Sequence, residues 1–572
     1  MNAPTETGRP ATTRNRFHAW GELALVVSAF GILTVLLIAP MALHLGSVGR
    51  LDNADTRMLI WNVAWVARTL IVDPLHVLDA NIFYPHRGTL VYSESNLGAG
   101  VLAIPVYWAT RNPYAAHNFV VLLTFVLSGT ATYYLVRYLS GDRRAAAVSG
   151  ICFAYCPYVF SHLPHVHLLM TAGLPLSMLA FHRLADRPTA WRGAALGLAL
   201  GGQAPFCGYY TVFAGLTVAF AVLVALAIRR RWTDLRYWAS IAVAAAVATA
   251  IALLMFVPYV RLQQAEDFRR PFEDARLFSA TWRTYFASSA YAHAWMLPII
   301  RHWNEVLFPG FIAVIGGVAG LVVGWVSRQH RELSILYGSL AALAFWASLG
   351  PDAGLYTVLT ATNPAFTFIR APSRIGVVVA FALSVLAGLS ISALLARLEG
   401  RTPAGGEIQS APRSRRRPAV VAALLAAAAV AELKVPLTFS PTTPTEPAYR
   451  ALAALPRGPV IEIPFYSTRF AAERTRYMLA STAHWMPLVN GFSSHIPRDV
   501  LENTPTLGSF PSREAFKILK RDQVRYAVFH MHTLDPAARA SVVARLGEYD
   551  RNLLRRYADN RIWLYEIVGF PD

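Results

Sequence analysis

Charged residues are scarce in this chain: only 15% of its 572 residues are Asp, Glu, Lys or Arg, whereas 55% are hydrophobic. A soluble protein carries about 25% charged residues, so the composition argues against a water-soluble globular enzyme. Apolar runs recur at about the 20 residues that a helix needs to cross the hydrocarbon core of a bilayer. The sequence therefore predicts a membrane protein that spans the bilayer several times.

Cysteine is also scarce, with Cys152, Cys156 and Cys207 each lying in an apolar stretch. Three residues in such positions provide neither a disulfide framework nor zinc-finger spacing. Cys152 and Cys156 are one helical turn apart, which is typical of small buried hydrophobes rather than of a redox or metal pair.

Acidic residues are fewer than basic ones, 33 against 52, which gives a net charge of +19. Such an excess can indicate nucleic-acid binding. Here, however, the basic residues lie mostly in short clusters between apolar segments, where the positive-inside rule places them on the cytoplasmic side. We therefore interpret the charge as membrane topology and predict no nucleic-acid partner.

The apolar segments predict about eleven transmembrane helices with a cytoplasmic N-terminus. The short stretch 96–110 contains Pro105 and is predicted to be an interfacial helix. The predicted domains are a cytoplasmic tail at 1–18, a transmembrane domain at 19–434 with outward loops 45–113, 260–308 and 350–374, and an extracytoplasmic domain at 435–572. The predicted spans lie near 20–44, 114–139, 145–160, 168–184, 193–208, 210–228, 237–259, 309–327, 333–349, 375–396 and 418–434.

The composition changes beyond residue 436. Strand-like runs at 460–463, 526–529 and 562–565 alternate with helical patterns around 513–521 and 536–556. The predicted fold class is an α-helical polytopic membrane protein with a C-terminal soluble α/β domain.

The first outward loop carries the candidate catalytic carboxylates Asp52, Asp55 and Glu94. Acidic residues at the membrane edge, each beside an apolar helix, can share one cavity. The alternative for Asp52 or Asp55 is a structural role as the N-cap of the helix through Trp61.

The turn after the third predicted span contains His162, His165 and His167. Neutral histidine is the commonest transition-metal ligand, so these residues are candidate ligands of a divalent metal ion. In the alternative interpretation, backbone groups or lipid headgroups satisfy the three rings.

Arg370 and Arg374 lie in a predicted outward loop, where the positive-inside rule disfavours them. Arginine forks match phosphate oxygens, so we expect a phosphate site, although anchoring to lipid headgroups is the alternative. Two further groups are candidates for substrate binding, with core packing as the alternative: Tyr209 and Tyr210 at a helix break, and Trp485 and Asn490 in the C-terminal domain.

Several short motifs together resemble the GT-C superfamily, integral-membrane glycosyltransferases that use polyprenyl-phosphate sugars. The resemblance covers nearly the whole chain. The motifs are Asp55-Thr56-Arg57 with Trp61, Asn62 and Trp65, then Phe83-Tyr84-Pro85, Ser93-Glu94, the run Ile369 to Arg374, His484-Trp485 and Asn490-Gly491.

The resemblance implies that Asp55 is the catalytic base and that Glu94 is a second acid. It implies transfer from a polyprenyl-phosphate-linked sugar to a lipid, glycan or protein acceptor, among the lipids of the bacterial cytoplasmic membrane. The chemistry itself requires a cation for the departing phosphate, so we expect Arg370, Arg374 and Arg57 to bind the donor phosphate, and a single displacement would invert the anomeric carbon. The superfamily often has acids where this chain has its three histidines. A transporter or flippase, and a non-catalytic scaffold, are the competing hypotheses.

Overall fold

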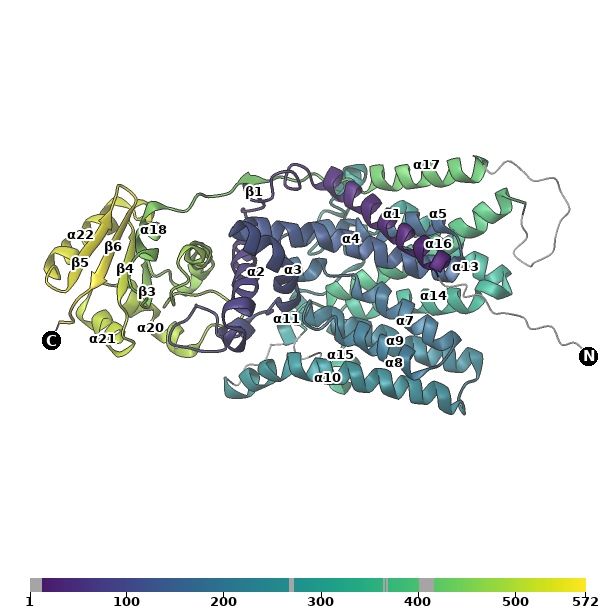
Figure 1. Ribbon diagram of the computed structural model, residues 1–572, viewed down its shortest axis with the longest axis horizontal. Coiled ribbons are helices and arrows are strands. Elements are labelled where there is room, and N and C mark those ends of the chain that lie inside the picture. Colours follow the sequence, from purple (N-terminus) through teal and green to yellow (C-terminus); the bar gives the residue numbers. More distant parts are fainter. Residues whose placement is uncertain (1–12, 267–271, 364–365, 367–368, 401–415, 572) are drawn as a thin grey trace, which may run out of the picture.

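The computed structural model describes residues 13–266, 272–363, 366, 369–400 and 416–571. Long helices run side by side in a bundle, and a smaller domain with a sheet lies beyond one end of it (Figure 1). Helices α2 (Ala54–Val72) and α3 (Leu97–Thr110) lie across that end, between the bundle and the smaller domain. Most of the predicted N-terminal tail, residues 1–12, lies outside the described residues.

Every predicted span overlaps at least one helix. Six helices in the described part of the chain have at least 18 residues and are apolar enough to cross a membrane. The protein is therefore a multi-pass membrane protein, while the number eleven stays a prediction. The remaining helices of the membrane part are α1 (Thr13–Ile38), α4 (Pro113–Ser140), α5 (Arg143–Ala154), α6 (Pro157–Ser161), α7 (Gly173–Asp186), α8 (Ala190–Gly201), α9 (Gly208–Arg229), α10 (Leu235–Ala265), α11 (Phe272–Leu277), α12 (Leu297–Ile300), α13 (Phe311–Val326), α14 (Arg328–Ser348), α15 (Leu355–Thr362), α16 (Gly376–Leu398) and α17 (Arg416–Glu432).

One predicted span, 145–160, is broken in two. Helix α5 ends at Ala154 and α6 begins at Pro157. Proline disfavours the helical conformation at the residue before it, and Cys156 is accordingly extended, with φ −62° and ψ 152°. The break leads the chain into the histidine-containing turn.

The basic linkers between helices meet at one end of the bundle, where they pair with acids from other helices. These pairs tie α1 to α5, α5 to the end of α16, and α9 to α14. The pairs are Arg143–Glu22 at 2.9 Å, Arg144–Glu399 at 2.8 Å and Arg229–Glu332 at 2.8 Å. The positive-inside rule predicts that this end is cytoplasmic, and that assignment stays a prediction.

Glycine allows two helices to approach closely in the centre of the bundle. Helix α16 is the most buried apolar helix, and α13 packs on it through Gly316, Gly317 and Gly320. A Cβ atom at Gly320 would collide with the carbonyl oxygen of Leu386. Such small-residue interfaces are typical of helices that associate within a bilayer.

The C-terminal domain contains a four-stranded mixed sheet with strand order β3-β4-β6-β5, in which β3 and β4 are parallel. The three predicted strands are confirmed as β3, β4 and β6, but the helical pattern at 536–556 is partly wrong because its end forms β5. This edge strand exposes Arg555 and Arg556, so it lacks the apolar alternation of a strand. The elements are α18 (Pro447–Ala453), β3 (Val460–Ile463), α19 (Thr475–Ala480), α20 (Arg498–Gly508), α21 (Arg513–Arg521), β4 (Tyr526–His530), α22 (Pro536–Glu548), β5 (Leu553–Ala558) and β6 (Ile562–Ile567).

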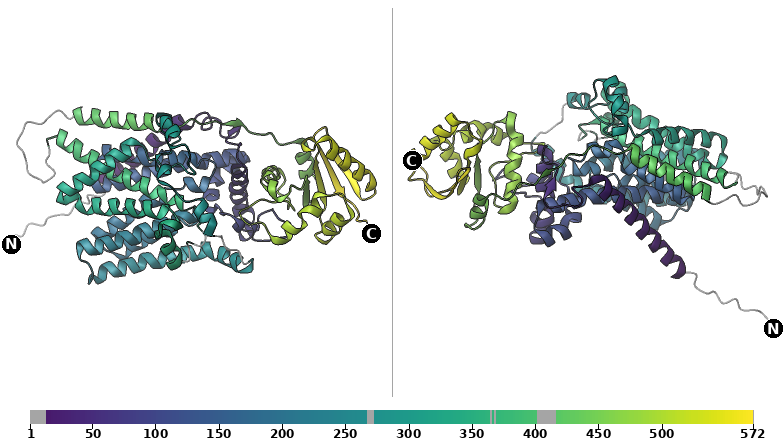
Figure 2. Two further views of the ribbon diagram at one scale, coloured as in Figure 1. Left: turned by 180° about the vertical axis from the view of Figure 1, so that it is seen from behind. Right: turned by 90° about the horizontal axis from the view of Figure 1, so that it is seen from above.

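The C-terminal part of the chain is bonded to the first outward loop, and all views show the two side by side (Figures 1 and 2). Strand β1 (Val48–Gly49) pairs with β2 (Ser440–Pro441) in antiparallel fashion. Further along the loop, the Tyr84 amide donates to the carbonyl oxygen of Leu488 at 2.8 Å. Residues far apart in the sequence therefore build one end of the molecule.

Candidate active site

Asp55 lies in the first turn of α2, at the end of the bundle. Asn53 is the N-cap of this helix, and its Oδ1 accepts a hydrogen bond from the Asp55 amide at 2.7 Å. The alternative in which Asp52 or Asp55 caps the helix is therefore wrong. The Asp55 side chain is 41% exposed, so its carboxylate is accessible at the edge of the bundle.

His165 contacts the Asp55 carboxylate, with 3.1 Å between Nε2 and Oδ2. This hydrogen bond is the main reason that the pKa of Asp55 lies below its ordinary value. The positive charges of Arg370 and Arg374 act in the same direction, and burial opposes them. Asp55 is therefore an ionised carboxylate at neutral pH, held in place by an imidazole.

Arg374 and Arg370 are both arranged around Tyr209. The Arg374 guanidinium lies 4.7 Å from the centre of the Tyr209 ring, and the Arg370 amide donates to the Tyr209 hydroxyl at 3.4 Å. The Arg370 guanidinium lies 4.2 Å from the ring centre of Phe278. Arg374 Nε is buried without a hydrogen-bond partner in the described part of the chain. A buried guanidinium nitrogen with no partner suits an anionic ligand.

The Glu94 carboxyl group contacts the N-terminus of α9. Its Oε1 accepts a hydrogen bond from the Gly208 amide at 3.0 Å. Burial raises the pKa of Glu94 to about 7, although the Gly208 amide and the charge of Arg374 oppose the rise. The charge of Arg374 thus favours the ionised form of both Glu94 and Asp55. The two carboxyl groups form hydrogen bonds with different partners.

Replacing Glu94 by glutamine is expected to change how stability depends on pH. Because its pKa is raised by folding, Glu94 stabilises the fold at acidic pH, and this contribution is lost as pH rises through about 7. We compare the free energy of unfolding of Glu94→Gln with that of wild type at each pH. This difference should shift in favour of the variant by on the order of 3 kcal/mol between pH 5 and pH 8. Thermal unfolding in nanodiscs from pH 5 to 8 measures this. If the stability of the two proteins changes with pH in the same way, Glu94 is not a buried ionisable group. The control is Asp73→Asn, at the exposed end of α2.

A second carboxylate and imidazole pair was missed by the sequence reasoning. His162 Nε2 lies 3.5 Å from Glu305 Oε2. Burial disfavours ionisation of Glu305, yet His162 and Arg374 hold its pKa below the ordinary value. The only sequence signal was an acid in the outward loop before α13, which resembles a solvated loop charge. Glu305 is therefore part of the electrostatic surroundings of Arg374.

The three histidines of the turn do not share one ligand position. His162 binds the carbonyl oxygen of Tyr158 and pairs with Glu305, whereas His165 pairs with Asp55. Within the described ranges, no group of three or more His, Cys, Asp or Glu side chains is arranged to hold a metal ion. The predicted ligand set His162, His165 and His167 thus does not fit a metal centre, because two of its rings are engaged by different carboxylates.

Asp52 and Arg57 bind partners outside this group, whereas Tyr210 is buried and interacts electrostatically with Arg374. Asp52 is exposed, with Oδ1 3.5 Å from Arg50 Nε. Arg57 donates to Thr475 Oγ1 at 3.1 Å and to the carbonyl oxygen of Leu51 at 3.0 Å, so it joins α2 to the C-terminal domain instead of lying with Arg370 and Arg374. Tyr210 is fully buried, and its hydroxyl donates to the carbonyl oxygen of Leu168 at 2.7 Å. Its position is a packing position.

Trp485 and Asn490 do not form an open sugar-binding surface. Asn490 is completely buried, where its side chain binds both the amide and the carbonyl oxygen of Glu462 in β3. Trp485 is buried against Trp65 of α2, with 5.7 Å between the ring centres. Asn490 therefore packs inside the C-terminal domain and Trp485 at its contact with α2, so both have the packing role of the alternative interpretation.

No protein-family model matches the sequence, and no curated protein matches it. Solved structures do match the fold. Arabinofuranosyltransferase AftD from Mycobacteria superposes with a TM-score of 0.52 and 14% identity over 96% of this chain and 40% of that chain. ArnT from Cupriavidus metallidurans, bound to undecaprenyl phosphate, gives 0.45 and 14% over 96% and 98%. Oligosaccharyltransferase AglB from Archaeoglobus fulgidus, in complex with an inhibitory peptide and a dolichol-phosphate, gives 0.45 and 13% over 93% and 72%.

The similarity to AftD shows the fold. This chain is a multi-pass membrane protein with the GT-C fold, and it spans about 40% of the length of AftD. The predicted resemblance is therefore confirmed at the level of fold.

Proposed function

We propose that this protein is a membrane glycosyltransferase that moves a sugar from a polyprenyl-phosphate donor to an acceptor of the cell envelope. The acceptor is a lipid, a glycan or a protein. The reaction takes place at the outer face of the bacterial cytoplasmic membrane, with the N-terminus cytoplasmic and the C-terminal domain extracytoplasmic. The fold shared with an arabinofuranosyltransferase supports the class of reaction.

The observation that carries this proposal is the joint position of Asp55, His165 and Arg374. An ionised carboxylate, fixed by an imidazole, shares an electrostatic environment with a buried guanidinium that has an unpartnered nitrogen. Sugar transfer from a lipid phosphate needs this combination, because one group must accept a proton while another stabilises the departing phosphate.

The chemistry follows in a single displacement. The acceptor hydroxyl gives its proton to Asp55 as its oxygen forms a bond to the anomeric carbon. The bond between that carbon and the phosphate oxygen breaks on the opposite side, and its electron pair leaves with the lipid phosphate, whose charge Arg374 and Arg370 stabilise. Attack from the side opposite the leaving group inverts the anomeric carbon. His165 positions the carboxylate by holding Oδ2.

Proteoliposomes that contain wild-type or Asp55→Asn protein provide the test. They are incubated with polyprenyl-phosphate hexose and pentose donors labelled in the sugar, together with envelope extract. We expect labelled product from wild type alone, with the anomeric configuration opposite to that of the donor by NMR. Donor translocation without product, equal in both proteins, would instead identify a flippase. The absence of both activities would identify a scaffold, and either result contradicts the proposal.

A further inference from the structure

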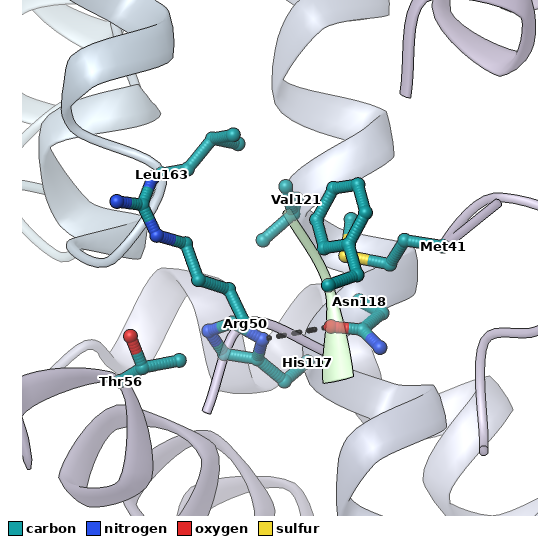
Figure 3. A pocket seen from close by; sticks show the side chains of 8 residues that line it. Met41, Arg50, Thr56, His117, Asn118, Val121 and Leu163 are labelled. Carbon is teal, nitrogen blue, oxygen red and sulfur yellow. Dashed lines mark hydrogen bonds between the residues drawn. The ribbon is translucent and has the colours of Figure 1, made fainter. Parts of the chain in front are cut away.

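A small hollow lies beside the start of α2, between that helix, α4 and the segment that enters the C-terminal domain. Its volume is about 10 Å³, which is room for about one water-sized group. Figure 3 shows Thr56, Arg50 and His117 on one side of the hollow, with Leu163 beside the end of the Arg50 side chain, and Asn118 and Met41 on the other side. The lining residues are Met41, Arg50, Thr56, His117, Asn118, Val121, Leu163 and Phe439.

Three polar atoms of this lining are buried and have no hydrogen-bond partner among the described residues: Arg50 Nε, Thr56 Oγ1 and His117 Nε2. Thr56 and His117 are each only 2% exposed. Buried polar atoms are normally paired, because an unpaired one loses its hydrogen bonds to water without replacement. Arg50 Nε forms a 3.5 Å ion pair with the exposed Asp52 but no hydrogen bond. Three buried atoms without a hydrogen bond around one hollow therefore indicate a small polar ligand.

The hydrogen-bonding role of His117 follows from its neighbour Asn118. Asn118 Nδ2 donates to the carbonyl oxygens of Leu45 and Val48, each at 2.8 Å. Asn118 Oδ1 is then the acceptor for His117 Nδ1 at 3.3 Å, a bond drawn in Figure 3. With the proton of the neutral ring on Nδ1, Nε2 presents a lone pair to the hollow.

The ligand must match a lone pair on His117, an N–H on Arg50 and a hydroxyl on Thr56. An ammonium or amide N–H₂ only donates and is disfavoured by Arg50. A carbonyl or phosphate oxygen only accepts and is disfavoured by the lone pair of His117. A hydroxyl both donates and accepts, and it is small enough to lie against the apolar side chains of Val121, Leu163 and Phe439.

The hollow adjoins the candidate catalytic residues along two elements. Thr56 follows Asp55 in α2, and Leu163 belongs to the same turn as His165, the partner of Asp55. The Arg50 side chain is 31% exposed, so the lining of the hollow extends to the surface at this residue. A larger molecule can therefore insert one hydroxyl while its remainder stays outside.

We propose that this hollow is an acceptor subsite, which binds one hydroxyl group of a sugar acceptor next to Asp55. The inference rests on the proposed function and deepens it, since it names a hydroxyl-bearing sugar as the acceptor class. His117 accepts from the bound hydroxyl, Arg50 donates to it and Thr56 completes the contact. The bound hydroxyl positions the acceptor, and a neighbouring hydroxyl of the same sugar is the one that Asp55 deprotonates.

Saturation-transfer NMR on the full chain in nanodiscs, without donor, tests the subsite. The probes are the methyl glycosides of glucose, mannose and galactose, and permethylated methyl glucoside is the control that cannot donate. We expect at least one methyl glycoside to bind wild type, and Thr56→Val and His117→Phe to weaken that binding about tenfold, the usual effect of losing a buried hydrogen-bond partner. Thr56→Ser, which keeps the hydroxyl, should retain binding. Thr69→Val, which removes a second buried and unpartnered threonine hydroxyl from α2, should retain it too.

Equal binding by wild type and Thr56→Val would overturn the proposal. Absence of binding by all methyl glycosides would mean that the hollow takes a water molecule only, which also overturns it. The NMR measurement contains no donor, so it tests the subsite independently of sugar transfer. If no methyl glycoside binds but sugar transfer is intact, only the subsite proposal is wrong. If a methyl glycoside binds but no sugar is transferred, the subsite is supported and the proposed function is wrong.

Discussion

A chain that carries Asp55→Asn is expected to fold normally and to transfer sugar about 10³-fold more slowly than wild type, in the range that a positioned general base contributes. Asparagine has nearly the shape of aspartate, and its Oδ1 can still accept the hydrogen bond from His165. It cannot take the proton of an acceptor hydroxyl, so only the chemical step is removed. The bound geometry around α2 should persist.

Initial rates with labelled donor measure the effect, with KM for donor and acceptor determined separately. We expect the loss in kcat, with both KM values within a few-fold of wild type. Asp73→Asn, which changes an exposed aspartate at the other end of α2, should leave the rate unchanged. A rate for Asp55→Asn within tenfold of wild type would remove Asp55 as the base.

Arg374→Ala is expected to lower kcat/KM for the donor by about 10² to 10³, the usual cost of losing one group that stabilises developing negative charge. The Arg374 guanidinium is buried beside Tyr209 and has an unpartnered Nε, so it is prepared for phosphate. Arg370 is exposed beside Phe278. Its replacement by alanine should therefore have a smaller effect.

Two further measurements separate phosphate binding from a structural role of Arg374. Arg374→Lys keeps the charge without the planar fork, so its rate should lie between those of wild type and Arg374→Ala. Added guanidinium ion should partly restore Arg374→Ala at concentrations that do not unfold the protein. Arg276→Ala, which removes an exposed arginine paired with Asp352, is the matched control. If guanidinium has no effect and lysine behaves as alanine, the assignment of phosphate binding fails.

Local patterns of the sequence predicted most of the fold. Apolar length located the helices, and β-branched or aromatic runs located Val460–Ile463, Tyr526–His530 and Ile562–Ile567. The errors arose where tertiary structure overrides the pattern. Pro157 divides an apolar run into two helices, and Leu553–Ala558 is a strand only because it pairs with β6 at the sheet edge.

The candidate site was predicted less completely. The motif around Asp55 and the arginines in the loop before α16 pointed to residues that the fold places in one electrostatic group. Sequence spacing did not show which partner each histidine has, so His165 was predicted as a metal ligand although it holds Asp55. Glu305 and His117 carry no local signal, because their significance depends on helices that meet only after folding.

The pairing of β1 with β2 ties the C-terminal segment to the loop that precedes Asp55, and Phe439 closes the neighbouring hollow. A truncation before residue 439 would remove both at once, so it would damage the membrane part as well as delete the C-terminal domain. Chimaeras between proteins of this fold should therefore exchange residues 439–442 together with the first outward loop. In this chain the C-terminal domain and the loop 45–113 form one structural unit.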